Sequence, residues 1–260
     1  MGWGTEAQSL HRRLRAARTP LEPRTVDFRE LDRLPAPVQR YLRAVLRDGQ
    51  PMVTAAHVRH EGTLNMGQGR DRWRSFTSNQ LVVTRRPGFD WDARIALLPG
   101  LAVRVHDAYV AGEGMLQVRM LGLFRLVDLR DGGALAEGEL MRFLAEGTWY
   151  PTALLPSQGV RWTAVDESSA RATLTDDRLR VSLLYQFDEH GLVDVVRAED
   201  RGRIVGATSV PTPWEGRFSR YAERGGMRVP LEGEVAWILP QGPRPYWRGR
   251  ITRIDYETSP

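Results

Sequence analysis

The sequence contains no cysteine and no lysine. The absence of cysteine excludes disulfides, thiolate nucleophiles, cysteine-based zinc sites and iron–sulfur clusters. It does not decide the redox compartment, because a secreted chain of 260 residues can fold without disulfides. All 37 basic residues are arginines, which we attribute to codon usage in a GC-rich genome, and the net charge is only +5. That mild balance favours solubility over a nucleic-acid partner.

Long apolar runs are also missing. No window approaches the roughly 18 consecutive apolar residues of a membrane-spanning helix. Residues 1–19 lack the apolar stretch of a signal peptide. As the sequence is written we expect a cytoplasmic protein. A shortened N-terminus would instead allow a membrane-associated or extracytoplasmic location.

Familiar catalytic motifs are absent as well. There is no phosphate-binding glycine loop, no G-x-S-x-G nucleophile elbow and no H-E-x-x-H zinc motif. His57 and His60 are three apart on a predicted strand, so they face opposite sides and cannot share a metal ion. His60 aligns with apolar neighbours, and we interpret it as a hydrogen-bonded core histidine. We expect no cofactor and no metal.

The N-terminal part of the chain differs from the rest. Residues 1–25 are rich in arginine and end in two prolines, which indicates a basic arm made of a short solvated helix and a linker. Residues 26–260 have the composition of one globular domain. Peripheral membrane contact through the arm is the alternative to a solvated helix.

Period-two alternation dominates from Met52 onward. Apolar and polar residues alternate most clearly in 89–97, 178–188 and 227–237, which predicts antiparallel strands with one wet face and one dry face. A helix is expected to begin at Pro37 and to end at Asp48. We predict further strands at 55–66, 72–84, 101–110, 114–128, 160–165, 169–175, 192–197, 200–205, 214–221 and 248–256. The fold class is therefore α+β, with one large antiparallel sheet.

Two sets of residues, the aspartates at 90 and 92 and the basic and aromatic residues at 244–250, invite functional interpretations that we do not favour. Asp90 and Asp92 share a strand face with Arg94 and could act as an acid–base pair, but a solvated strand face is the far commoner reason for such a pattern. Basic and aromatic residues mix at 244–250, as in single-strand binders. Because acidic residues are interspersed among the arginines elsewhere, we expect no nucleic-acid partner.

One helix interrupts the strands at about 134–147. Apolar residues cover more than half of its circumference, so it must be mostly buried. Glu139, Arg142 and Glu146 form a narrow charged stripe, and their i+3 and i+4 spacings predict that Arg142 pairs with both glutamates. This stripe must face either water or a polar cavity.

Several motifs together resemble a bacterial family described only as a domain of unknown function. They are Pro87-Gly88-Phe89-Asp90-Trp91-Asp92-Ala93-Arg94, the run Gly138-Glu139-Leu140-Met141-Arg142-Phe143-Leu144-Ala145-Glu146, and Trp149-Tyr150-Pro151-Thr152-Ala153-Leu154-Leu155-Pro156-Ser157. The resemblance covers about residues 34–256 and implies no activity; relatives often carry an N-terminal hydrophobic segment that is lacking here. The chain is also similar to the half-barrel of lipoprotein carriers, which implies a curved sheet with a helix on its concave face.

These observations leave three hypotheses for function. The first is a non-catalytic binding protein for a lipid-like or other apolar small ligand, and its candidate pocket residues are Glu139, Arg142, Glu146, Trp149, Tyr150, Trp91 and Trp214. The second is a hydrolase or isomerase that uses Glu139 or Glu146 with Arg142. The third is a membrane-surface domain. A purely structural role for the stripe is the competing interpretation.

Overall fold

Alternating residues build a single antiparallel sheet in the computed structural model, which describes residues 3–18, 24–67, 70–121, 124–206 and 208–258. The described residues form three α-helices and thirteen strands. These are α1 Trp3–Ala16, α2 Ala36–Val45, β1 Val53–Asn65, β2 Trp73–Val83, β3 Gly88–Leu98, β4 Leu101–Val110, β5 Glu113–Met120, β6 Phe124–Asp131, α3 Ala134–Glu146, β7 Arg161–Ala164, β8 Ser169–Asp176, β9 Leu179–Phe187, β10 Val193–Val205, β11 Thr208–Arg224, β12 Met227–Leu239 and β13 Gly242–Thr258.

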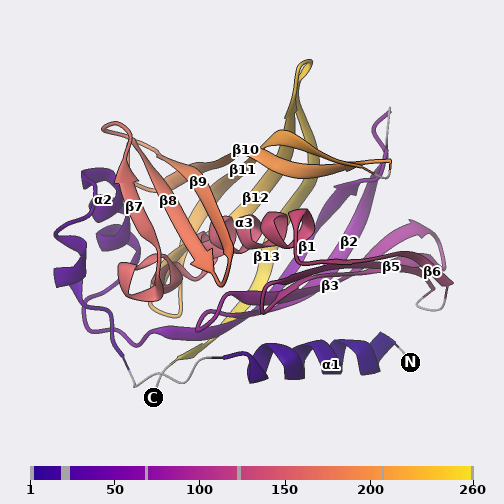
Figure 1. The fold of residues 1–260 in the computed structure, drawn as a ribbon, viewed down its shortest axis with the longest axis horizontal. Helices are drawn as coiled ribbons and strands as arrows, with labels where there is room; N and C mark the ends of the chain where they lie inside the picture. The colour runs from indigo at the N-terminus through magenta and orange to yellow at the C-terminus, as the bar shows by residue number, and fades with distance from the viewer. Residues whose placement is uncertain (1–2, 19–23, 68–69, 122–123, 207, 259–260) are drawn as a thin grey trace.

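The strand order is two meanders joined by one pairing. Strands β1 to β6 follow one another outward from the middle, and so do β12 to β7 on the other side. The last strand, β13, lies between β1 and β12 and pairs antiparallel with both. Figure 1 shows the resulting curved sheet, which confirms the predicted α+β fold with a half-barrel-like sheet.

Most predicted strands are present, and two assignments are wrong. The segment 114–128 is not one strand, since the chain turns after Met120 and β6 begins at Phe124. The segments 192–197 and 200–205 are not separate, because β10 continues through both with a bulge between Ala198 and Arg201. A bulge interrupts the alternation without ending the strand.

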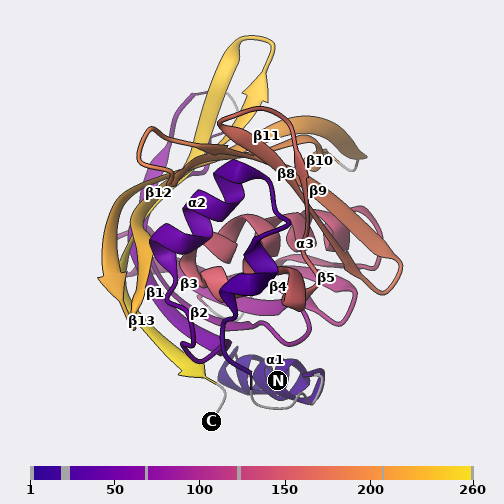
Figure 2. The same ribbon diagram turned by 90° about the vertical axis from the view of Figure 1, so that its left-hand side faces the viewer.

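Helix α3 lies across the concave face of the sheet, where the sequence placed the mid-chain helix. Its residues Leu140, Phe143 and Leu144 are buried in the main core, together with inward-facing residues of the strands. It contacts β5, β9 and β10, which belong to both halves of the sheet. Figure 2 shows the sheet curling round this helix, with α2 near one end.

Helix α1 packs on the opposite, outer face of the sheet, below it in Figure 1. Leu10 and Leu14 form a second, smaller core with outward-facing strand residues such as Leu81. Burying such side chains contributes about 1.5–3 kcal/mol each. The prediction of a solvated helix is therefore wrong for its apolar side, whereas the division into an arm and a domain stays a prediction.

The same docking corrects the interpretation of the Asp90 face. Asp90 is fully buried under α1 and lies 2.9 Å from His106 Nδ1 and 3.1 Å from His11 Nε2. These partners lower the pKa of its carboxyl against the opposing effect of burial. The predicted solvated face is thus wrong at Asp90, because an element distant in sequence covers it.

Three glycines lie directly opposite one another at the centre of the sheet. Gly62 of β1 pairs with Gly249 of β13, which in turn pairs with Gly233 of β12. A Cβ atom on Gly249 would lie 2.5 Å from the Trp247 ring, so glycine is what allows this indole to lie close against the strand.

None of the described helices is long and apolar enough to cross a bilayer.

Candidate functional site

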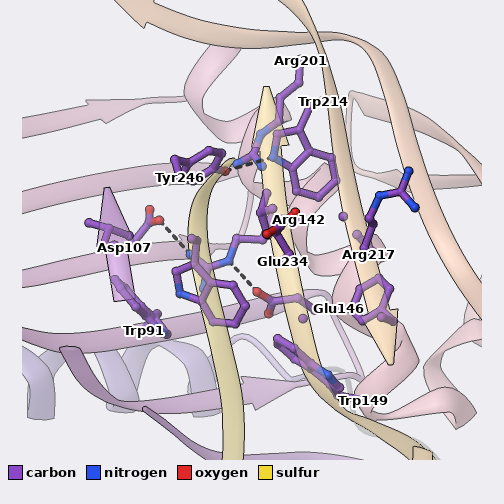
Figure 3. Close-up of a pocket in the computed structure, with 17 residues that line it drawn as sticks. Trp91, Asp107, Arg142, Glu146, Trp149, Arg201, Trp214, Arg217, Glu234 and Tyr246 are labelled. Atoms are coloured by element: carbon purple, nitrogen blue, oxygen red, sulfur yellow. Dashed lines mark hydrogen bonds and ion pairs between the residues drawn. The ribbon is translucent and has the colours of Figure 1, made fainter. Parts of the chain in front are cut away.

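A pocket of about 110 Å³ opens on the concave side of the sheet, between α3 and strands of both halves. Its wall is mainly aromatic and aliphatic, and Figure 3 shows the labelled side chains converging from the two sides. The apolar wall includes Leu64, Trp91, Trp149, Trp214, Phe218 and Trp247. Polar groups of Asp107, Arg142, Glu146, Arg201 and Tyr246 also line it.

Arg142 is the centre of the polar part of the pocket. Its Nε donates to Glu146 Oε1 at 2.6 Å and its Nη1 donates to Asp107 Oδ2 at 2.7 Å. Its guanidinium lies over two aromatic rings, 4.7 Å from the centroid of Phe89 and 5.4 Å from that of Trp91. Such stacking suits the flat, weakly hydrated guanidinium group better than an ammonium group.

The predicted stripe on α3 is therefore only half right. Arg142 pairs with Glu146 as predicted, but Glu139 instead accepts from Arg201 Nη2 at 3.4 Å. Arg142 takes Asp107 of β4 as its second carboxylate. The pairing differs because a second cation, Arg201, shares this interior and binds Glu139, which leaves Arg142 to bind Asp107 and Glu146.

Gln80 completes the support of Glu146. Its amide Nε2 donates to Glu146 Oε2 at 2.5 Å, so both oxygens of that carboxylate have partners. Glu146 is thereby fixed in position from α3 and β2 together.

Glu139 has a different environment. Burial, together with the nearby Asp107 carboxylate, raises its pKa to about 8. Its Oε2 is buried and has no hydrogen-bond partner among the described residues. Burial also raises the pKa of Asp107, while the surrounding carboxylates raise the pKa of Arg142 above its ordinary value. Near neutral pH the cluster therefore balances best with Glu139 protonated.

The tryptophans of the wall leave two donors unpaired. The indole Nε1 atoms of Trp91 and Trp149 are buried and have no hydrogen-bond partner among the described residues. Trp214 differs, since its Nε1 donates to the Tyr246 hydroxyl at 3.0 Å. Buried donors without partners are uncommon in native structures.

The structure brings five of the seven predicted site residues to one pocket: Trp91, Arg142, Glu146, Trp149 and Trp214. Glu139 and Tyr150 do not line it. Tyr150 is fully buried, and its hydroxyl donates to the Phe143 carbonyl at 2.9 Å. Among the described parts of the chain, no three His, Asp or Glu side chains are placed to hold a metal ion.

Sequence reasoning missed Asp107 and Arg201. Asp107 interrupts the inward-facing series Val103, Val105 and Tyr109 of β4, so a lone carboxylate in a dry face was the available signal.

His60 is buried as predicted and lies 3.2 Å from the Ser78 hydroxyl. Burial and the charge of Arg142 lower its pKa to about 3, so it is neutral at physiological pH.

The model of a family of unknown function, DUF6920, matches residues 32–256. Comparison with curated protein sequences gives no match.

Solved structures show distant likeness. A domain described as an outer membrane lipoprotein-sorting protein of Vibrio parahaemolyticus is 11% identical, with 79% of this chain and 86% of that one covered and a TM-score of 0.43. A DUF1329 family protein of Desulfovibrio piger is 12% identical, with 79% and 86% covered and a TM-score of 0.40. A LolA superfamily protein of Nitrosomonas europaea is 10% identical, with 98% and 94% covered and a TM-score of 0.37.

Proposed function

Since this chain belongs to the DUF6920 family of unknown function, as its motifs led us to expect, we propose its function from the geometry of the site: it is a non-catalytic binding protein for a small apolar ligand. The observation that carries the proposal is the pocket on the concave face, whose exposed wall is mostly apolar and includes four tryptophans, with polar groups converging on it. Small-molecule sites commonly have this composition.

The volume of the pocket limits what it can hold. At about 110 Å³ it is smaller than the roughly 300–1,000 Å³ of a site that encloses a drug-sized ligand. We therefore propose that it accepts an aromatic ring or the end of an alkyl chain.

The polar groups support binding more than catalysis. Glu146 lines the pocket, but both of its carboxylate oxygens are already bonded, to Arg142 and Gln80. Glu139 has the raised pKa that acid–base work requires, but it does not line the pocket. A carboxylate-dependent enzyme would need one residue that lines the pocket and also has a raised pKa.

Gly216 offers a direct test because it lines the pocket and tolerates a side chain. A Cβ atom there would make ordinary contacts, at 3.5 Å from Trp214 and 3.7 Å from Phe218. We expect Gly216→Val to fill the pocket and to weaken binding of the fluorescent apolar probe N-phenyl-1-naphthylamine, whose phenyl ring would enter it, about tenfold, the loss that roughly 1.4 kcal/mol corresponds to. Gly132→Val, outside the pocket, is the matched control.

The measurement is a fluorescence titration of the full chain, after native mass spectrometry has established whether a ligand co-purifies. The proposal predicts that wild type and Gly132→Val bind the probe alike. It would be abandoned if wild type failed to bind the probe, or if Gly216→Val bound it as tightly as wild type does.

A further inference from the structure

Exposed large apolar side chains gather on four hairpins of the sheet. Ten such side chains are strongly exposed among the described residues, and all but Val165 belong to the hairpins β1–β2, β3–β4, β5–β6 and β10–β11. The most exposed are Leu98 at 64% and Phe124 at 65%, and Ile204 follows at 52%. Single exposed apolar residues are ordinary, but their confinement to four hairpins is not.

The topology brings the turns of these four hairpins to one end of the molecule. Neighbouring strands are antiparallel throughout, so β1, β3, β5 and β10 all run toward the same end. The ends of these strands lie on the right in Figure 1. The turn that carries Val165, between β7 and β8, lies at the opposite end by the same argument. We call the described residues at and next to these strand ends the rim.

The net positive charge of the chain is concentrated at the same rim. The segments 64–74, 92–104, 121–130 and 203–210 contain eight arginines and three aspartates, a net charge of +5. The whole chain also has a net charge of +5, so the remainder is neutral overall. Arg70, Arg72 and Arg94 are exposed members of this set.

The combination of separate apolar tips with interspersed arginines selects one kind of partner. The centre of a protein–protein interface is depleted of charge and needs a contiguous apolar area. A bilayer surface requires neither a charge-free centre nor a contiguous apolar area. Single apolar side chains can enter it between lipids, while arginines pair with anionic head groups. We propose that the rim docks on the surface of a bilayer that contains anionic lipid.

The position of the rim also suits the concave pocket. Leu64 of the pocket wall is two residues from Met66 of the rim, and Trp214 is four residues from Val210. Four residues of strand span about 13 Å. Docking through the rim would therefore bring the pocket close to the lipid surface, although the docking itself does not depend on the proposed ligand.

Vesicle flotation tests the proposal with the full chain. We expect wild type to float with vesicles of phosphatidylcholine and phosphatidylglycerol in a 3:1 ratio, and to float much less with phosphatidylcholine alone or at 1 M salt. The triple variant Leu98→Ser, Phe124→Ser, Ile204→Ser should lose at least about tenfold in its partition coefficient, because it removes three apolar side chains that would leave water for the bilayer.

Two controls separate the rim from other surfaces. Val165→Ser removes an equally exposed apolar side chain at the other end and should bind as wild type does. Arg12→Gln removes an exposed charge of α1 and should also leave binding unchanged. The proposal is overturned if wild type does not bind anionic vesicles, if the triple variant binds as well as wild type, or if Arg12→Gln loses binding while the triple variant retains it.

Discussion

Arg201 Nη2 lies 3.4 Å from Glu139 Oε1, and both side chains are less than a tenth exposed. The guanidinium also lies over the Trp214 ring, 4.8 Å from its centroid, so one cation joins β10, α3 and the pocket wall. Together with Arg142 it faces the carboxyl groups of Glu139, Asp107 and Glu146, and the two guanidinium charges balance the two that are ionised near neutral pH. The charge balance of this interior is the basis of the first two predictions.

Replacing Arg142 with methionine should strongly destabilise the protein. The substitution leaves Asp107 and Glu146 without their cation, and uncompensated buried charge typically costs about 3–5 kcal/mol. Urea denaturation measures the loss in free energy of unfolding. Arg220→Met, on the exposed surface, should cause no measurable loss. Equal midpoints for the two variants would contradict the role given to Arg142.

Glu139 should make the protein less stable as pH rises. Its pKa is about 8 in the folded state against 4.5 in the unfolded state, so its contribution is fully present below pH 4.5 and is lost as pH rises toward 8. Glu139→Gln should therefore raise the Tm at pH 9 by about 3 °C or more, a shift worth roughly 1 kcal/mol in a chain of this size. Thermal unfolding at pH 5 and pH 9 checks this, and equal changes at both pH values would refute it.

His60 should make the protein less stable as pH falls. Its pKa is lowered from 6.5 to about 3, so the unfolded state takes up a proton that the folded state refuses. The contribution of His60 to the free energy of unfolding is therefore complete above pH 6.5 and is lost as pH falls toward 3. His60→Phe should flatten this acid limb of the stability curve, measured as Tm from pH 3.5 to 7. An unchanged slope would show that other groups cause it.

Trp3 should hold α1 on the outer face. Its ring stacks on His106 with a centroid distance of 4.1 Å, and its Nε1 donates to Asp92 at 3.1 Å. Trp3→Ala should speed hydrogen exchange of residues 4–16 about tenfold or more, since loss of a largely buried tryptophan costs about 3 kcal/mol. Arg12→Ala, on the exposed side of α1, should leave that exchange unchanged. Equal protection in the two variants would count against the proposed anchor.

How far the sequence predicts the site depends on whether a side chain follows its local pattern. Glu146 and Arg142 are one helical turn apart, so their contact follows from spacing alone. Arg201 does not follow its strand: alternation from Val196 and Ala198 places Asp200 inward, but the bulge after Ala198 shifts the register and turns Arg201 inward instead. A bulge of this kind cannot be predicted from period-two alternation.

The outer face illustrates a second limit. Alternation correctly separates Leu81 and Ala108 from the inward-facing residues of β2 and β4, but it does not say what covers them. Only the fold brings α1 over them, and with it His11 over Asp90. Contacts between segments so distant in sequence have no local signature, which is why Asp90 was expected in solvent.

The place of β13 in the sheet has a consequence for folding. Every other pairing joins strands that follow one another along the chain, and such hairpins can form early. The pairing of β1 with β13 instead joins distant parts of the chain, and beside it the Thr54 hydroxyl donates to the Glu257 carbonyl, 203 positions away. The two halves of the sheet can therefore assemble separately, and their closure along this seam should be the slow step, with the half-barrel first opening there when it is strained.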